Sequence, residues 1–137
     1  MSWIPESTTY FSILGQTRRK RWCLKDLLPV PRTTVDRHVG DGEVIDDLNG
    51  LQVIHTPGHC AGQVAFLWPR EGGVLFVGDA AANTLGLRLS ISYEDLALGK
   101  RMLAKLAALP FSVALFGHGR TIASGAAEKF ARKWGTA

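Results

Sequence analysis

Three short segments each place a residue capable of metal chemistry close behind a run of apolar residues. LQVIHTPGH ends at His59, GVLFVGD ends at Asp79, and VALFGHG contains His118. Each apolar run is typical of a strand, and each is followed by a glycine-containing turn. Because the strands of one sheet can end at a common edge, these three side chains could meet there. Imidazole and carboxylate groups suit zinc, iron or manganese, so the three segments together indicate a metal site.

Other residues of similar chemistry are interpreted as structural. His38 alternates with its neighbours as a residue on the surface of a strand would, and His55 points opposite to Ile54, where it orients a neighbour or faces solvent. Cys60 adjoins His59, but adjacent side chains on an extended chain diverge, so we do not expect it to be a ligand.

The first part of the chain after the N-terminal segment has the pattern of successive strands. Asn49-Gly50 joins two of them and is a strong hairpin signal, and residues 70–73 join another pair. Short strands are predicted at 33–39, 43–47, 51–56, 63–69 and 73–79.

The pattern changes to helical after Asp79. Ser92, followed by Asp95, resembles a capping box that begins a helix ended by Pro110. A strand is expected around 112–119, and Ser124 is the expected cap of a last amphipathic helix. The buried stripes are predicted to be Leu96, Leu103, Leu106 and Ala107 in the first helix and Ala123, Ala127, Phe130, Ala131 and Trp134 in the second. This order predicts an α+β fold, a mainly antiparallel or mixed sheet with helices covering one face.

Length and composition favour one globular domain spanning residues 1–137. The chain has 46% hydrophobic and 20% charged residues, an ordinary balance, and no apolar run approaches the roughly 20 residues that span a bilayer. Its first residues lack the order of a signal peptide, and its two cysteines are too few for a disulfide framework. We therefore expect a cytoplasmic protein with free thiols and no membrane partner.

Part of the net charge of +4 lies in one block, Arg18, Arg19, Lys20 and Arg21, which Trp22 follows. Basic residues beside an aromatic ring could bind the phosphates of a nucleic acid. A solvated turn or helix end is the favoured explanation of the block, and no second basic stripe extends it. Nucleic-acid binding is therefore kept only as an alternative function.

The segments TPGH at 56–59, GD at 78–79 and GHG at 117–119, in this order, resemble the metallo-β-lactamase superfamily. The likeness is closest to its broad hydrolase branch, which includes glyoxalase II-like thioesterases, and covers roughly residues 25–134. The resemblance implies half of a four-layered αββα sandwich, formed by 31–134 after a variable segment 1–30. It also implies that His59 belongs to a first metal site, that Asp79 bridges two metals as a catalytic ligand, and that His118 belongs to the second site.

The chain departs from that family at the front of the fold. The family's first half carries a His-x-His-x-Asp-His motif that supplies four ligands, and this chain contains neither His-x-His nor Asp-His. The expectation is therefore a truncated, metallo-β-lactamase-like protein with an incomplete site for zinc, iron or manganese. That site could be empty, and full hydrolase activity is not expected of this chain alone.

The missing half leaves two further expectations. The inner sheet face needs a cover, which the first 30 residues or a second copy of the chain in a homodimer could provide. Alternatively, a dimer mate or a separate chain carrying the missing half completes an active hydrolase of ester, thioester or lactam type. Arg88, in the loop that would face the site, is the candidate for binding an anionic substrate group, although it could also be a plain surface residue.

Overall fold

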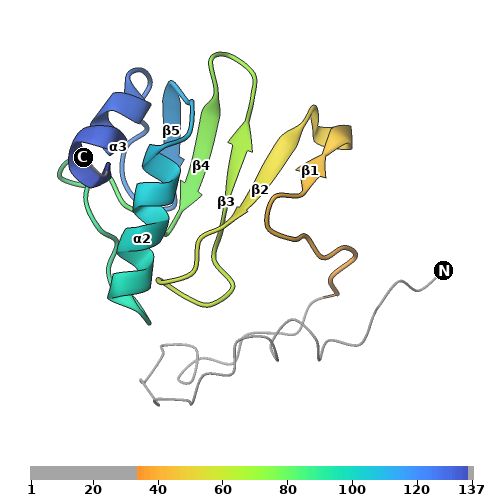
Figure 1. The fold of residues 1–137 in the computed structure, drawn as a ribbon, viewed down its shortest axis with the longest axis horizontal. Helices are drawn as coiled ribbons and strands as arrows, with labels where there is room; N and C mark the ends of the chain where they lie inside the picture. Colours follow the sequence, from red (N-terminus) through yellow and green to blue (C-terminus); the bar gives the residue numbers. More distant parts are fainter. Residues whose placement is uncertain (1–33, 136–137) are drawn as a thin grey trace. The chain divides into compact units, whose positions relative to one another are not determined.

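A five-stranded sheet with two helices on one face forms the fold. The computed structural model describes residues 34–135, and all the elements lie within the compact unit Val39–Ala137 (Figure 1). The elements are β1 (Val44–Ile45), β2 (Leu51–His55), β3 (Val64–Trp68), β4 (Val74–Gly78), α2 (Leu96–Ala107), β5 (Val113–Phe116) and α3 (Ala126–Trp134), with a 3-10 turn at Asp46–Leu48. The predicted α+β class, with helices covering one face of a mixed sheet, is confirmed.

The sheet is a meander with one parallel addition. Its strand order is β1-β2-β3-β4-β5; the first three pairings are antiparallel, and β5 runs parallel to β4. Asn49 and Gly50 adopt positive φ at the β1–β2 turn, as the Asn-Gly signal predicts. The parallel pair requires a long crossover, and α2 lies within it.

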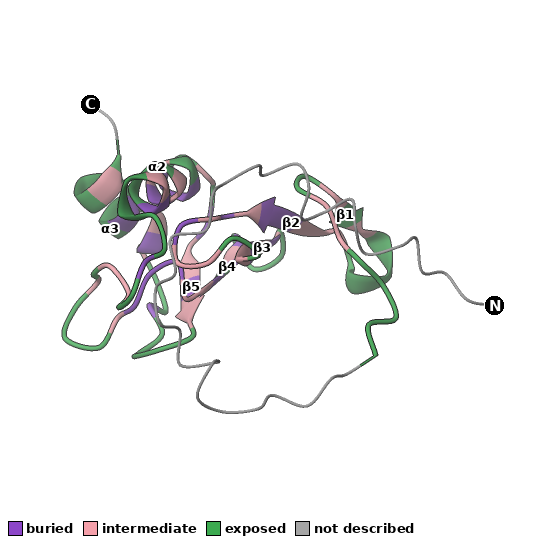
Figure 2. Cartoon of the chain, turned by 90° about the horizontal axis from the view of Figure 1, so that it is seen from below, coloured by how far each residue is buried: buried purple, intermediate pink, exposed green. Residues whose placement is uncertain are grey.

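Alternation along the strands separates two faces of the sheet. The residues that face the helices are buried, and they form one cluster with Leu103, Leu106 and Phe130 of the helices: Ile54, Ala65, Leu67, Leu75, Val77 and Ala114. Figure 2 shows the buried residues concentrated between the helices and the sheet. The opposite side, here called the second face, carries Phe66, Phe76 and Leu115 in register across β3, β4 and β5.

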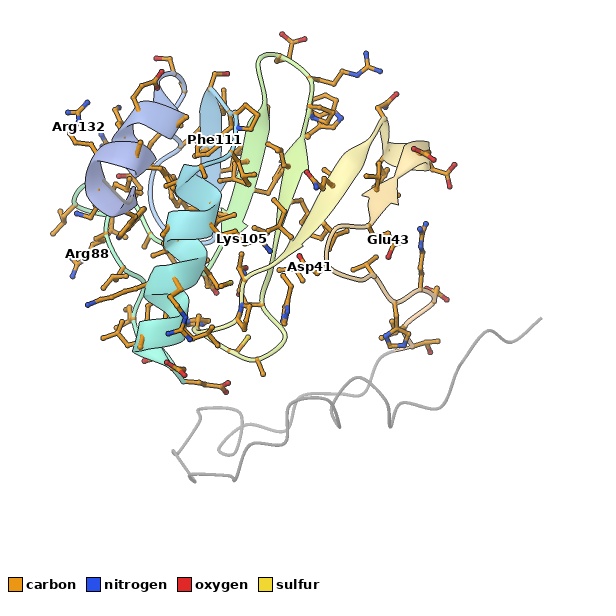
Figure 3. All side chains as sticks on the ribbon, in the orientation of Figure 1. Asp41, Glu43, Arg88, Lys105, Phe111 and Arg132 are labelled. Carbon is orange, nitrogen blue, oxygen red and sulfur yellow. The ribbon has the colours of Figure 1, made fainter. Side chains whose placement is uncertain are left out.

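The end of β2 and the later part of α2 are tied together by Asp41. Its carboxylate accepts a hydrogen bond of 2.7 Å from the His55 amide and forms an ion pair of 3.2 Å with Lys105 (Figure 3). The bond from His55 lowers the pKa of Asp41, Lys105 acts in the same direction, and partial burial opposes them. The carboxylate is largely exposed, so solvent screens this contribution to stability.

Several local predictions are wrong, each for a tertiary reason. Residues 34–39 form no strand; 34–38 are exposed, and β-branched residues favour strands only on a half-buried surface. His38 is thus not on a strand surface. The second predicted strand is shortened to Val44–Ile45, because the chain turns into the 3-10 segment at Asp46.

The helix starts also differ from prediction. Asp95, not Ser92, caps α2 by accepting a hydrogen bond of 2.9 Å from Leu98, while Ser92 adopts a positive φ in the preceding turn. Gly125, not Ser124, precedes α3, and no side chain caps that helix. Of the predicted apolar stripes, Leu96, Ala123 and Ala131 are exposed, whereas Leu103, Leu106, Ala107 and Phe130 are buried.

Neither helix within residues 34–135 is long and apolar enough to cross a membrane. The segment 1–30, and with it the basic block Arg18, Arg19, Lys20 and Arg21, lies outside the described residues.

Candidate metal centre

Three strands of the sheet end at the edge that carries the predicted metal ligands. Strands β2 and β4 are both antiparallel to β3, and β5 is parallel to β4, so β2, β4 and β5 run in one direction. His59 follows β2 through a short turn, Asp79 comes directly after β4, and His118 lies shortly beyond β5. The topology therefore brings three separate parts of the sequence to one edge.

Asp79 lies between the two histidines. Its Oδ2 is 3.9 Å from His59 Nε2, and its Oδ1 is 3.5 Å from His118 Nε2. The His118 side chain is 68% exposed, whereas those of His59 and Asp79 are 25% and 35% exposed. One carboxylate is thus shared by two imidazoles, and the His118 side of the arrangement is open to solvent.

Two buried polar atoms of this arrangement lack hydrogen-bond partners. These are Asp79 Oδ1 and His59 Nδ1; no described residue forms a hydrogen bond to either. The contact between His118 and Asp79 Oδ1 is an ion-pair distance without the geometry of a hydrogen bond. Buried polar atoms are normally satisfied, so the unpaired oxygen of a carboxylate that lies between two imidazoles is a group that could bind a metal cation.

The ligand set is nevertheless incomplete within the described residues. No group of three or more His, Cys, Asp or Glu side chains there is arranged to hold a metal ion. His55 does not add to the set, because its Nε2 lies 2.8 Å from the carbonyl oxygen of Ala61. Of the two roles predicted for His55, orienting a neighbour or facing solvent, this contact with Ala61 fits the first. The types of donor group therefore fit a divalent metal. The number of donors that the described residues gather at one point is too small to hold the metal firmly.

A close backbone contact holds the turn that carries His59 against the start of α2. Gly58 has φ +139°, and a Cβ atom there would overlap the backbone of Gly99. The carbonyls of Gly58 and His59 accept hydrogen bonds from Asp95 and Glu94, at 2.9 and 3.2 Å. These bonds help explain why α2 begins at Leu96, after the cap residue Asp95: the amides of Glu94 and Asp95 are already bonded to the His59 turn.

Asn83 holds the loop that carries His118. The amide of Asn83 donates to the His118 carbonyl at 3.0 Å, and its side chain donates to the Arg120 carbonyl at 2.7 Å. Gly117 lies against Asp79, since a Cβ atom at Gly117 would overlap the Asp79 carboxylate. The glycines around His118 therefore allow the loop and the carboxylate to approach closely.

Tyr93 is a component of this region that the sequence interpretation missed. Its hydroxyl donates to the carbonyl of Ala80, and its ring lies edge-to-face with the His59 imidazole, with ring centroids 6.0 Å apart. Tyr93 lies in an irregular segment with no periodicity or motif, so no signal in the sequence could have identified it.

Arg88 lies in the predicted loop after Asp79, where its backbone pairs with Ala82 at 3.0 and 2.9 Å. Its side chain is exposed and points outward from the sheet (Figure 3). The structure does not bring it into the group formed by His59, Asp79 and His118, and its predicted role in substrate binding stays a prediction. Cys60 is a free, half-buried thiol.

A partly antiparallel sheet with helices on one face, and His-Asp-His residues at one edge, defines an α+β fold with a candidate metal centre. Sequence comparison gives the family: the profile of the metallo-beta-lactamase superfamily matches residues 5–118, most of the chain. The protein belongs to the metallo-beta-lactamase superfamily, as the resemblance predicted.

Solved structures agree with this assignment. A metallo-beta-lactamase family protein from Thermus thermophilus is 30% identical, with a TM-score of 0.54, over 74% of this chain and 34% of that one. An archaeal metallo-beta-lactamase superfamily protein from Sulfolobus tokodaii is 21% identical, with a TM-score of 0.57, over 80% and 43%, and shows likeness of fold. This chain thus spans about a third of the length of the first protein and less than half of the second. A search of curated proteins found no match.

Proposed function

We propose that this chain provides one half of a metallo-β-lactamase-type metal centre and has no full hydrolase activity on its own. The observation that carries the proposal is the position of Asp79 between His59 and His118, with a buried carboxylate oxygen that no described residue satisfies. The sequence lacks the His-x-His-x-Asp-His motif that would supply the other ligands. His59, Asp79 and His118 would hold zinc, iron or manganese only as a partial ligand set.

A metal bound at such a centre would supply Lewis acidity and an activated water. The contribution of this chain's own residues is positional. Asp79 offers one oxygen toward each histidine, and the glycines at 58 and 117 let the backbone come close enough for that arrangement. An alternative follows from the same geometry: a dimer mate or a separate chain supplies the remaining ligands, and the assembly hydrolyses an ester, thioester or lactam.

Zinc titration of the purified full chain distinguishes these proposals. We expect weak binding, no measurable ester, thioester or lactam hydrolysis, and a loss of zinc affinity in Asp79→Ala. That loss should exceed the roughly 10- to 100-fold that removal of an outer-shell partner costs, because a direct ligand is removed. Calorimetry measures the affinity, and Asp47→Ala is the control, because Asp47 is an exposed carboxylate in the turn that precedes β2, whereas His59 follows the other end of that strand.

Two results would change the assignment. Near-stoichiometric metal that survives gel filtration, is lost in Asp79→Ala and accompanies hydrolysis would favour the assembled hydrolase. Unchanged zinc affinity in Asp79→Ala would remove the metal centre from both proposals.

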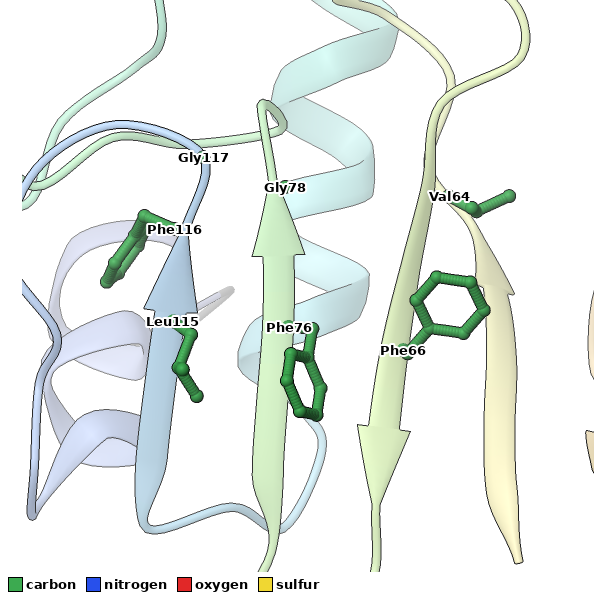
Figure 4. Close-up of a pocket in the computed structure, with 7 residues that line it drawn as sticks. All are labelled: Val64, Phe66, Phe76, Gly78, Leu115, Phe116 and Gly117. Carbon is green, nitrogen blue, oxygen red and sulfur yellow. The ribbon is translucent and has the colours of Figure 1, made fainter. Parts of the chain in front are cut away.

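The second face of the sheet supports the proposal of a homodimer. Phe76 is 39% exposed there, and it lines a shallow hollow of about 280 Å³ together with Phe66, Leu115 and others (Figure 4). Aromatic and aliphatic groups gathered on one face are typical of a contact surface. We propose that a second copy covers this face, and that the hollow, which reaches Gly78 and Gly117, lies next to the metal-centre edge.

Light scattering coupled to size-exclusion chromatography measures this association. We expect a dimer at micromolar concentration and a shift toward monomer in Phe76→Asp, because a carboxylate would be buried in the contact. Leu85→Glu is the control and should leave the mass unchanged, because Leu85 is 91% exposed in the loop after Asp79. A wild-type monomer would refute the homodimer.

A further inference from the structure

We propose that Tyr93 is a positioning residue that fixes the His59 imidazole relative to the segment carrying Asp79. The inference deepens the proposed function and rests on it in one respect: the metal is the expected reason for holding the two ligands in register. Tyr93 belongs to neither ligand-bearing segment. It lies in the turn before α2 and contacts both of them.

The first contact is with the Asp79 side. The Tyr93 hydroxyl donates a hydrogen bond to the carbonyl of Ala80, the residue that follows Asp79, and the tyrosine is only 7% exposed. Burial raises the pKa of this phenol, although the Ser90 backbone acts in the opposite direction, so the hydroxyl remains protonated and can donate at neutral pH. The bond fixes the chain direction at the point where β4 gives way to the loop.

The second contact is with His59. The two rings meet edge-to-face, with an interplanar angle of 88° and centroids 6.0 Å apart. Metal-binding histidines usually have their ring plane set by a hydrogen bond from the second ring nitrogen. His59 Nδ1 is buried and has no such partner among the described residues, so the aromatic contact is the feature that can set the plane of this imidazole.

The third contact explains a glycine inside α2. Gly99 is buried within the helix, where glycine costs about 1 kcal/mol relative to alanine. A Cβ atom at this position would overlap the Tyr93 ring, and a Cβ atom at Gly58 would overlap the Gly99 backbone. Gly99 therefore leaves the space in which the tyrosine ring and the His59 turn both lie against the helix.

Two substitutions separate the contacts. Tyr93→Phe keeps the ring and removes the hydrogen bond to Ala80, whereas Tyr93→Leu removes both. NMR of the ¹³C,¹⁵N-labelled full chain reports the His59 ring resonances and the amides of residues 79–81, and calorimetry reports the zinc dissociation constant. We expect Tyr93→Phe to shift the amides with little change at His59. Tyr93→Leu should also shift and broaden the His59 ring signals and weaken zinc binding by about 10- to 100-fold, the range for outer-shell partners.

Phe111→Leu is the matched control. Phe111 is also buried and meets Phe130 edge-to-face at 89°, with centroids 5.2 Å apart, but it precedes β5 and thus lies at the opposite end of that strand from His118. It should lower stability as Tyr93→Leu does, while zinc affinity and the His59 signals stay at their wild-type values. This separates positioning from a general loss of packing.

The outcomes distinguish this inference from the proposed function. If the wild-type chain binds no zinc, the proposed metal centre is refuted. The His59 ring signals in Tyr93→Leu then test by themselves whether Tyr93 positions the imidazole. Wild-type His59 signals in Tyr93→Leu would overturn the inference, and so would a wild-type zinc dissociation constant in that variant. If Tyr93→Leu does not fold, unshifted 79–81 amides in Tyr93→Phe overturn it instead.

Discussion

Replacing Phe130 with alanine is expected to lower the free energy of unfolding by about 3–5 kcal/mol. Phe130 is fully buried, and its ring contacts those of Phe111, Phe116 and Trp134, with centroids 5.2, 6.2 and 5.0 Å away. The substitution leaves a cavity where α3 meets the sheet. Urea denaturation followed by circular dichroism measures the effect, which is a large share of the roughly 5–15 kcal/mol that stabilises a typical domain.

Leu85→Ala provides the comparison for this measurement. It also deletes an apolar side chain, but Leu85 is 91% exposed, so the free energy of unfolding should change by less than about 0.5 kcal/mol. A loss below about 1 kcal/mol in Phe130→Ala would contradict the packing of α3 against the sheet.

Gly58→Ala is expected to cost about 3 kcal/mol or more of stability and to displace His59. A φ of +139° strains any residue with a side chain, and the new Cβ atom would overlap the Gly99 backbone; each effect is worth about 1–3 kcal/mol. Because the turn cannot keep its position against α2, zinc affinity should fall together with stability. Denaturation and zinc calorimetry on the same preparation measure both losses.

Gly62→Ala is the matched control in the same loop. Gly62 does not have a positive φ, and a Cβ atom there has nothing within 4 Å. Stability and zinc affinity should therefore stay close to wild type, and equal losses in the two variants would show that the contact with Gly99 has no special role.

The sheet could be predicted well from the sequence because its signals are local. Short β-rich runs separated by Asn49-Gly50 and by the turn at 70–73 specify antiparallel neighbours, and the same runs contain the motifs of the superfamily. The common edge of His59, Asp79 and His118 follows from strand direction, which the order of the turns nearly determines.

The details that could not be predicted depend on contacts between distant segments. Serine is a residue type that often caps helices, so Ser92 is a reasonable candidate. The turn that contains Ser92 is instead shaped by the hydrogen bonds that Glu94 and Asp95 donate to the turn carrying His59. The role of Gly99 is visible only when Tyr93 and Gly58 are seen against it. Such contacts leave no periodicity in the sequence.

The parallel pairing of β4 and β5 also has a kinetic consequence. The β2–β3 and β3–β4 hairpins involve neighbours in sequence and are expected to form within about 1–10 μs, whereas β5 can join only after residues 79–112 have been brought across the sheet. His118 arrives with β5. A nascent chain still emerging from the ribosome would therefore form the β2–β3–β4 meander, with His59 and Asp79 at its strand ends, before β5 is paired. The candidate metal centre would be completed last, when His118 reaches the sheet.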